Sequence, residues 1–114
     1  MVLSLFARAV AVFRWSIIDK DAASALLAKE IGADALLLLT DVDGVYRDFG
    51  TPDAHRIETL SPDEARALSL PDGSMAPKVT AAANFVTAGK MAGIGRLEDA
   101  AEILAGQAGT RISV

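Results

Sequence analysis

The chain has 114 residues and a formal net charge of -4, with 52% hydrophobic and 23% charged residues. This length allows at most one domain with a modest core, and the acidic balance disfavours a general nucleic-acid surface, so we expect a small-molecule site. The absence of cysteine excludes disulfides and thiolate metal sites and is compatible with a cytoplasmic protein. No apolar run is long enough for a transmembrane helix, and residues 1–18 lack the features of a signal peptide, so we expect no membrane association.

The first interpretable elements precede residue 33. Residues 1–18 mix helix-favouring and strand-favouring side chains, and only Trp15–Ile18 is typical of a short strand. Strong helix formers predict a helix over Ala22–Ile31, with Asp21 as its N-cap and Gly32 just past its end. This helix should lead directly into the strand that follows.

An unbroken apolar run, Leu36–Leu39, gives the clearest strand signal in the chain. Without polar alternation it is typical of a strand that is covered on both faces, as in the parallel sheets of layered α/β domains. The run ends in a polar turn from Thr40 to Gly44, and the carboxyl end of such a strand is where open α/β sheets bind ligands. We therefore expect the chemistry of this protein to be centred on that turn.

Turns, helices and short strands alternate in the rest of the chain. Past Tyr46, glycine, proline and aspartate indicate turns, and Arg56–Leu60 is a candidate edge strand. Ser61 and Glu64 form a capping-box pattern, which predicts a helix from 62 to about 69. The remaining expected elements are a loop over 71–78, a helix over Val79–Ala88 closed by Gly89, a glycine-weakened strand over Met91–Gly95, a helix over Leu97–Leu104 and a strand over Thr110–Val114.

The turn Asp41-Val42-Asp43-Gly44 allows two interpretations. It is either a tight turn, in which aspartate supplies local hydrogen bonds and glycine a positive φ, or a ligand-facing strand end. A calcium loop is disfavoured because the oxygen-bearing residues do not continue past Asp43. An aspartyl-nucleophile phosphatase also places Asp-x-Asp-Gly after an apolar strand, so Asp41 as a nucleophile is a weaker alternative.

Two further segments suit phosphate chemistry. Lys20 stands between Asp19 and Asp21, and an ammonium held by two carboxylates stays charged and can stabilise a transferring phosphoryl group. The alternative is a solvated helix start that Asp21 caps. In Gly73–Lys78, glycine permits close backbone approach, and helix N–H groups with the lysine ammonium suit a phosphate chain. Here the alternative is a loop with a solvent-facing lysine.

These motifs, in this order, closely resemble the C-terminal part of carbamate kinase, a family of the amino acid kinase superfamily. Several superfamily members share the Thr-Asp-Val-Asp-Gly-Val string, whereas the Asp-Lys-Asp triplet and the Gly-Ser-Met-x-Pro-Lys loop point to carbamate kinase specifically. The resemblance takes in nearly everything after residue 17. The stretches that carry it are Ile18–Asp21, Ala23–Ala28, Leu39–Tyr46, Asp48–Asp53, Leu60–Leu68, Gly73–Val79, Leu97–Ala100 and Gly109–Ile112.

The resemblance implies a three-layer α/β/α sandwich with a mainly parallel sheet, and an enzyme that transfers phosphate between ATP and carbamate, physiologically from carbamoyl phosphate towards ATP. It also implies ATP or ADP with Mg²⁺, a homodimer, and no metal ligand among the protein side chains. Catalytic roles would fall on Lys20, on Asp19 and Asp21, which would orient the lysines, and on Lys78, which would hold the nucleotide phosphates. The nucleoside pocket would be lined by Thr40, Asp41, Val42, Val45, Tyr46, Gly73, Ser74, Met75 and Pro77.

The same resemblance divides the chain into a divergent segment, 1–17, and a nucleotide-binding part, 18–114. The family's N-terminal half carries glycine-rich loops for the phosphoryl group and carbamate, and nothing before Trp15 matches it. We therefore expect a truncated kinase that binds nucleotide without turnover on its own. Ala76 also replaces the usual glycine of the phosphate loop. The alternative is a non-catalytic remnant that self-associates through exposed sheet edges.

Overall fold

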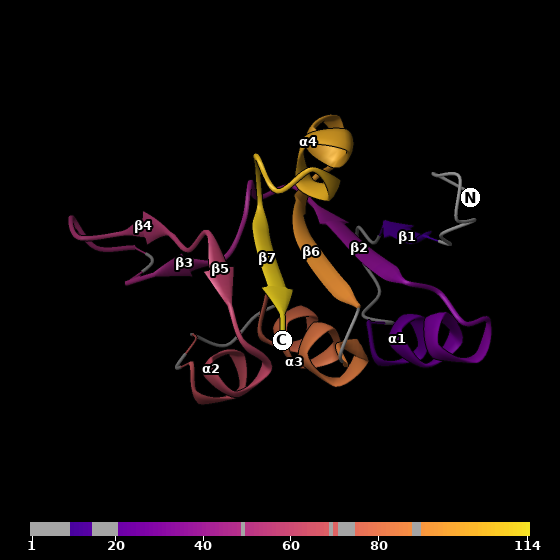
Figure 1. Ribbon diagram of the computed structural model, residues 1–114. Helices are drawn as coiled ribbons and strands as arrows, with labels where there is room; N and C mark the ends of the chain where they lie inside the picture. The colour runs from indigo at the N-terminus through magenta and orange to yellow at the C-terminus, as the bar shows by residue number, and fades with distance from the viewer. Residues whose placement is uncertain (1–9, 15–20, 49, 69, 71–74, 88–89) are drawn as a thin grey trace.

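A five-stranded sheet with helices on both of its faces organises the chain (Figure 1). The computed structural model describes residues 10–14, 21–48, 50–68, 70, 75–87 and 90–114. Its strands are β1 (Val10–Arg14), β2 (Ala35–Thr40), β3 (Tyr46–Arg47), β4 (His55–Arg56), β5 (Thr59–Leu60), β6 (Met91–Arg96) and β7 (Thr110–Ser113). The helices are α1 (Asp21–Glu30), α2 (Pro62–Ala67), α3 (Met75–Phe85) and α4 (Ala100–Leu104), the last preceded by a 3₁₀ turn over Leu97–Asp99.

Strand order in the main sheet is β1-β2-β6-β7-β5. The first three strands are mutually parallel, with Thr40 of β2 beside Arg96 of β6. Strand β7 runs antiparallel to β6 and places Thr110 opposite Ile94, while β5 is parallel to β7. The carboxyl ends of β1, β2 and β6 therefore lie at the same edge as the start of β7, and we call this the carboxyl edge. A mixed but mainly parallel sheet confirms the expected α/β class.

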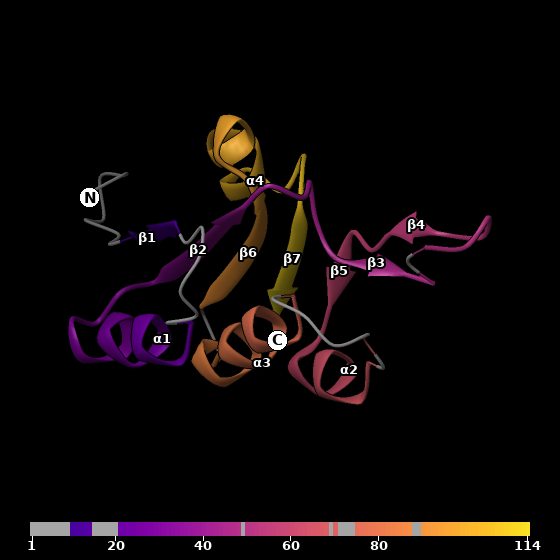
Figure 2. The ribbon, with the colours of Figure 1, turned by 180° about the vertical axis from the view of Figure 1, so that it is seen from behind.

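The two faces of the sheet are covered by different helices. Leu36 and Leu38 belong to the apolar cluster that includes side chains of α1, α2 and α3. Their neighbours Leu37 and Leu39 belong to a smaller cluster around Ile103 of α4. The two opposite views agree in placing α4 across the sheet from the other three helices (Figures 1 and 2). All four leucines are almost fully buried, which confirms that β2 is covered on both faces.

Strand β6 is an interior strand despite its glycines. A Cβ atom on Gly93 would stand 2.4 Å from Cγ2 of Ile103, and one on Gly95 would stand 2.6 Å from its Cδ1. Both glycines thus make room for the isoleucine of α4, whose side chain is fully buried against the strand. The glycines that the sequence analysis interprets as weakening the strand instead allow α4 to approach β6 closely.

Helix α1 begins at Asp21, one residue before its predicted start, and ends at Glu30. Past its end, the Gly32 N–H donates to Lys29 O at 3.1 Å and the Ala33 N–H donates to Ala28 O at 2.9 Å. Gly32 has a φ of 72°, so it closes the helix as predicted, in a Schellman motif. From the other side of the connection, Lys90 Nζ donates to Ala33 O at 2.5 Å.

Around α2 the prediction is confirmed at the start of the helix but not in the strand before it. The Ser61 hydroxyl accepts the Glu64 N–H at 3.1 Å, and the Glu64 carboxylate accepts the Ser61 N–H at 2.9 Å. The bond from the Ser61 backbone is the main reason why the pKa of Glu64 is lowered. The helix ends at Ala67, and the expected strand over 56–60 is instead divided between β4 and β5. The division falls at Ile57, whose N–H donates to Val45 O at 2.8 Å, next to the pairing of Arg56 with Tyr46 in the hairpin.

Helix α3 covers 75–85 rather than the predicted 79–88. The earlier start places Pro77 inside the first turn, where its missing N–H removes no helical hydrogen bond. The proline that seemed to end a loop is therefore part of the helix. The predicted closing residue Gly89 lies outside the described residues, as does the strand predicted over Trp15–Ile18. In the preceding stretch, which the sequence left uninterpreted, β1 forms an end strand of the sheet.

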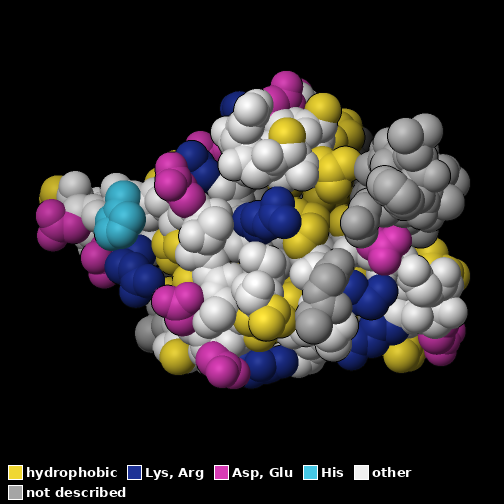
Figure 3. Space-filling model, in the orientation of Figure 1, with side chains coloured by type: hydrophobic (Ala, Val, Ile, Leu, Met, Phe, Trp, Pro, Cys, Tyr) yellow, Lys and Arg dark blue, Asp and Glu magenta, His cyan; other side chains and the backbone are white. Residues whose placement is uncertain are grey.

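The hairpin of β3 and β4 projects from the body of the molecule and gives it a longest dimension of 44 Å, against 26 Å in the other two directions (Figure 1). Acidic and basic side chains lie along it, with His55, the single histidine, exposed near its end (Figure 3). Among the described helices, none is long and apolar enough to cross a membrane.

Candidate functional site

The segment that leaves β2 occupies the carboxyl edge, where ligand binding is expected. Asp41 is exposed, Thr40 and Val42 are half-buried, and Val45 is fully buried. Tyr46 is half-buried and begins the projecting hairpin. These are the first five residues of the candidate nucleoside pocket, and they lie in one continuous segment from the last residue of β2 to the first residue of β3.

Thr110 fixes the buried part of this turn. Its Oγ1 accepts the N–H of Val45 at 2.8 Å and donates to the carbonyl of Ile57 at 2.6 Å. The Val45 carbonyl in turn accepts the Ile57 N–H at 2.8 Å. The side chain of Thr110 is fully buried. A hydroxyl at the start of β7 thereby bonds to two backbone groups that lie 65 and 53 residues earlier in the sequence.

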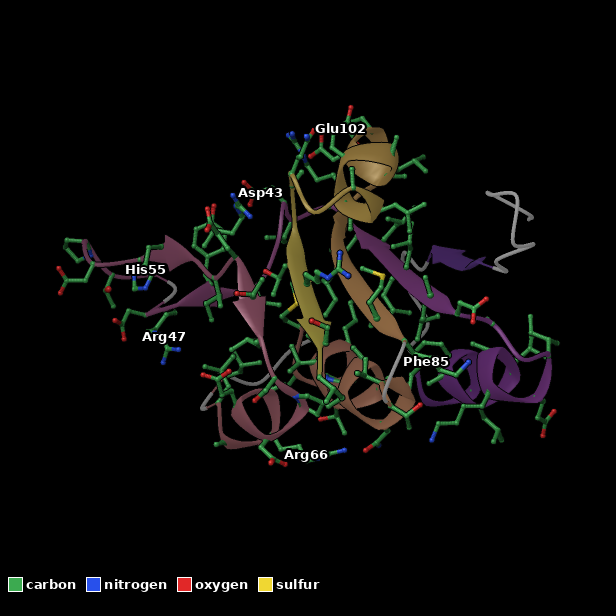
Figure 4. All side chains as sticks on the ribbon, in the orientation of Figure 1. Asp43, Arg47, His55, Arg66, Phe85 and Glu102 are labelled. Carbon is green, nitrogen blue, oxygen red and sulfur yellow. The ribbon has the colours of Figure 1, made fainter. Side chains whose placement is uncertain are left out.

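Charged side chains surround the exposed part of the turn. Asp43 lies near the start of β7, and its Oδ2 accepts the Tyr46 hydroxyl at 3.3 Å (Figure 4). This bond is the largest cause of a raised pKa for Tyr46; partial burial adds to it, and the charges of Arg56 and Arg96 oppose it. Arg96, at the end of β6, pairs with Asp99 at 2.9 Å, and that bond is the main cause of its own raised pKa.

Gly44 is required in this turn by crowding rather than by its backbone angles. It does not have a positive φ, in contrast to Gly32 and Gly50. A Cβ atom here would stand 3.0 Å from Arg56 Cγ and Cδ and 3.0 Å from Thr110 Oγ1. The positive φ that the tight-turn interpretation assigns to this glycine is therefore wrong, whereas the local hydrogen bond that it expects from aspartate is present at Asp43. Glycine is present because two side chains close over the backbone.

The second group of predicted residues lies on α3. Met75 and Pro77 are half-buried in the first turn of the helix, and Lys78 is only 3% exposed. The solvent-facing alternative for Lys78 is therefore wrong. Val45 and Val79 belong to one apolar cluster, against which Met75 also packs. This cluster links the start of α3 to the turn after β2.

Several predicted site residues cannot be placed. Gly73, Ser74, Asp19 and Lys20 lie outside the described residues, and for Asp21 only its position at the start of α1 is described. No three His, Asp or Glu side chains of the described part of the chain gather into a metal site.

The structure also adds four residues that sequence reasoning did not assign to the site, namely Asp43, Arg56, Arg96 and Thr110. Asp43 was visible within the Asp-x-Asp motif. Arg56 reaches the turn through the hairpin, in which it pairs with Tyr46. Arg96 and Thr110 come from distant parts of the chain and reach the turn only through the strand order.

Comparisons with known proteins agree with this arrangement. The family model described as amino acid kinase family matches residues 4–94, a range that includes the segment before Trp15. Carbamate kinase of Escherichia coli O6:H1 is 51% identical over 100 residues, which are 87% of this chain and 34% of that protein. Carbamate kinase of Halobacterium salinarum is 47% identical over 102 residues, 85% of this chain and 33% of that protein. The chain thus spans about a third of the length of these relatives.

Solved structures give the same result. Carbamate kinase from Giardia lamblia bound to AMP-PNP superposes with a TM-score of 0.76 at 42% identity, over 83% of this chain and 35% of that one. N-acetylglutamate synthase from Neisseria gonorrhoeae, in complex with coenzyme A and L-arginine, superposes with a TM-score of 0.64 at 26% identity, over 82% of this chain and 23% of that one. By the extent of the family match and by its α/β/α fold, the chain belongs to the amino acid kinase family.

Proposed function

We propose that this chain is the nucleotide-binding part of a carbamate kinase-like phosphotransferase. The observation that carries the proposal is the likeness to a carbamate kinase bound to AMP-PNP, which extends over most of this chain. The whole reaction would transfer phosphate between ADP and carbamoyl phosphate to give ATP and carbamate. We further propose that this chain alone binds nucleotide without turnover, because it spans only about a third of its relatives.

The nucleoside would lie against the turn after β2. This segment offers the exposed side chain of Asp41 and the half-buried side chains of Thr40 and Tyr46. A pocket with a few fixed polar groups beside apolar side chains is the usual form of a small-molecule site. Val45 supports the turn from the interior, and Met75 would close the pocket from α3.

Lys78 would act on the phosphates. It is positioned by the first turn of α3, and the N–H groups at a helix start favour negative charge. A lysine held mostly out of water would attract phosphate more strongly than an exposed one, since the local dielectric is lower. Phosphoryl transfer depends mainly on such positioning and charge neutralisation.

Lys20, with Asp19 and Asp21, keeps its proposed role at the phosphoryl group. Mg²⁺ would accompany the nucleotide, since this ion is usually held by substrate phosphates with one or two carboxylates. The ion would neutralise phosphate charge, and the chain's own residues would bind and orient the nucleotide.

Calorimetric titration of the purified chain with ADP and Mg²⁺ tests the proposal, alongside a coupled assay for ATP formation from carbamoyl phosphate. We expect saturable binding, no turnover, and a marked loss of affinity in Lys78→Met. Methionine preserves most of the buried stem and removes the charge. Lys29→Met, which removes an exposed charge from the last turn of α1, is the matched control and should bind ADP like the parent.

Absence of ADP binding in a folded parent protein would contradict the proposal, and so would equal affinities for the parent and Lys78→Met. Turnover by the isolated chain would show that the assignment to this family's reaction is correct but that the expected dependence on further segments is wrong. Phosphate release that is abolished by Asp41→Asn would instead support the aspartyl-nucleophile phosphatase.

A further inference from the structure

Thr110 makes two hydrogen bonds, and both depend on its hydroxyl group. Its Oγ1 accepts from the Val45 N–H and donates to the Ile57 carbonyl, at 2.8 and 2.6 Å. The side chain is fully buried, so water does not compete with either bond. We propose that Thr110 is a positioning residue for the nucleotide site, which holds the turn after β2 in the shape that receives the nucleoside. This inference rests on the proposed function.

The two bonds complete a closed arrangement between Val45 and Ile57. The Ile57 N–H donates a hydrogen bond to Val45 O. The Thr110 hydroxyl accepts a hydrogen bond from the Val45 N–H and donates one to Ile57 O. Without the hydroxyl, a buried donor and a buried acceptor would both lose their partners, which is costly inside a protein. The turn would then shift or admit water to satisfy them.

Close packing leaves the turn little room to adopt another position. Gly44 lies against Thr110 and Arg56, and a Cβ atom on it would make tight contacts of 3.0 Å with both side chains. The Arg56 guanidinium donates to the carbonyl of Gly109, which immediately precedes Thr110. Gly109 has a φ of 67° and a backbone that lies against Ile94 O and Ile103. The backbone that carries the Thr110 hydroxyl is thus closely packed at Gly109. Through its bond to the Val45 N–H, this hydroxyl is an anchor that can hold the residues on either side of Val45 in place.

Thr110 does not itself reach the proposed pocket as a ligand contact. Its side chain is buried beneath the turn, whereas Asp41 is exposed and Tyr46 half-exposed above it. Its effect on nucleotide affinity is therefore indirect. Such a role predicts that the presence of a hydroxyl matters more than the presence of a methyl group.

Two substitutions separate these contributions. Thr110→Val keeps the shape and removes the hydroxyl, whereas Thr110→Ser keeps the hydroxyl and removes the methyl group. Hydrogen exchange of the Val45 amide, followed by NMR in the ligand-free protein, reports the anchor. Calorimetry with ADP and Mg²⁺ reports the pocket. Ile112→Val removes a buried methyl group from the same strand without touching the anchor, and it controls for a general loss of stability.

We expect Thr110→Val, which loses both hydrogen bonds, to lose protection of the Val45 amide and to bind ADP about tenfold more weakly. This ratio is on the order of the net contribution of one buried hydrogen bond, because the rest of the cost falls on folding stability. Thr110→Ser and Ile112→Val should keep the affinity of the parent. If Thr110→Val does not fold, Gly44→Ala serves in its place, because its Cβ would press on Oγ1 and displace the turn.

Three results would overturn the inference. In the first, Thr110→Val loses the amide protection yet binds ADP like the parent, so that the anchor does not shape the pocket. In the second, Ile112→Val weakens ADP binding as much as Thr110→Val, so that stability alone explains the effect. In the third, the Val45 amide is equally protected in the parent and in Thr110→Val. A parent that is folded and protected at Val45 but does not bind ADP would instead refute the proposed function, and with it the role of this anchor in nucleotide binding.

Discussion

Asp48 has a backbone conformation that residues other than glycine rarely adopt, with a φ of 57° just after β3. The hairpin needs this conformation because the Asp48 carbonyl accepts both the N–H and the hydroxyl of Thr51. Left-handed geometry costs an L-residue roughly 1–2 kcal/mol, and glycine avoids that cost while adding some entropy to the unfolded chain. We expect Asp48→Gly to raise the free energy of unfolding by about 0.5 kcal/mol, measured by urea denaturation.

The control for this substitution is Asp53→Gly in the same hairpin. Asp53 is also exposed, but its φ is not positive. Glycine there relieves no strain and only increases the freedom of the unfolded chain, so stability should fall. A stabilising effect at both positions would show that charge, rather than backbone strain, is the cause.

Tyr46 is the only tyrosine in the chain, so its ionisation can be followed directly by the absorbance of tyrosinate. Its pKa lies above the ordinary 10.0, chiefly because its hydroxyl donates to Asp43. We expect Asp43→Asn to lower this pKa, and Asp41→Asn, the control, to leave it nearer to the parent's. The folded state holds the phenol proton more tightly than the unfolded state. The contribution of this pKa shift to stability is therefore complete below pH 10.0, and it is lost as the pH rises through the raised pKa of Tyr46.

At the scale of secondary-structure elements, the contact between β6 and α4 gives a sharp test. Gly93 and Gly95 both face Ile103, but they approach different atoms of it, Cγ2 and Cδ1 respectively. Because the core is close-packed, we expect Gly93→Ala and Gly95→Ala each to lower the free energy of unfolding by about 1–3 kcal/mol.

Ile103→Val distinguishes between the two glycines, since valine lacks Cδ1 but keeps the atom that corresponds to Cγ2. Combined with Gly95→Ala, it should recover part of the lost stability; combined with Gly93→Ala, it should not. Equal recovery at both positions in urea denaturation would mean that α4 moves as a unit, and that the individual contacts do not decide the cost.

For the whole molecule, we expect one cooperative unfolding transition. The clusters on the two faces of the sheet share β2 and β6, because alternate leucines of β2 belong to opposite clusters. Unfolding of either apolar cluster would disrupt β2 and β6, on which the other cluster also depends. Far-UV circular dichroism and the NMR signals of the Tyr46 ring should therefore give the same midpoint in urea. An earlier midpoint for Tyr46 would indicate that the projecting hairpin and the candidate site unfold separately from the sheet.

Local patterns in the sequence predict much of this fold. The apolar run of β2, the capping box at Ser61 and the closing glycine at Gly32 each act within a few residues, and each is found where predicted. The start of α3 was misplaced because Pro77 suits both a loop and a first helical turn.

The sequence could not predict features that depend on long-range contacts. Gly95 in β6 is indistinguishable from a weak strand residue until Ile103 is placed beside it. In the same way, Thr110 is an ordinary strand residue until β7 is placed next to the turn after β2. The motif at Asp41 predicted where the candidate site lies, but not which buried side chains hold it.

The bond between Val45 and Thr110 also has a consequence for biosynthesis. Its two partners are 65 residues apart, and the ribosome makes the turn long before it makes the hydroxyl that anchors it. Until translation has passed residue 110, the Val45 N–H can donate only to water or to a partner other than Thr110. A nascent chain stalled before that point would expose the segment around Val45 to proteases and chaperones, whereas a chain that contains Thr110 can fold and bury Val45.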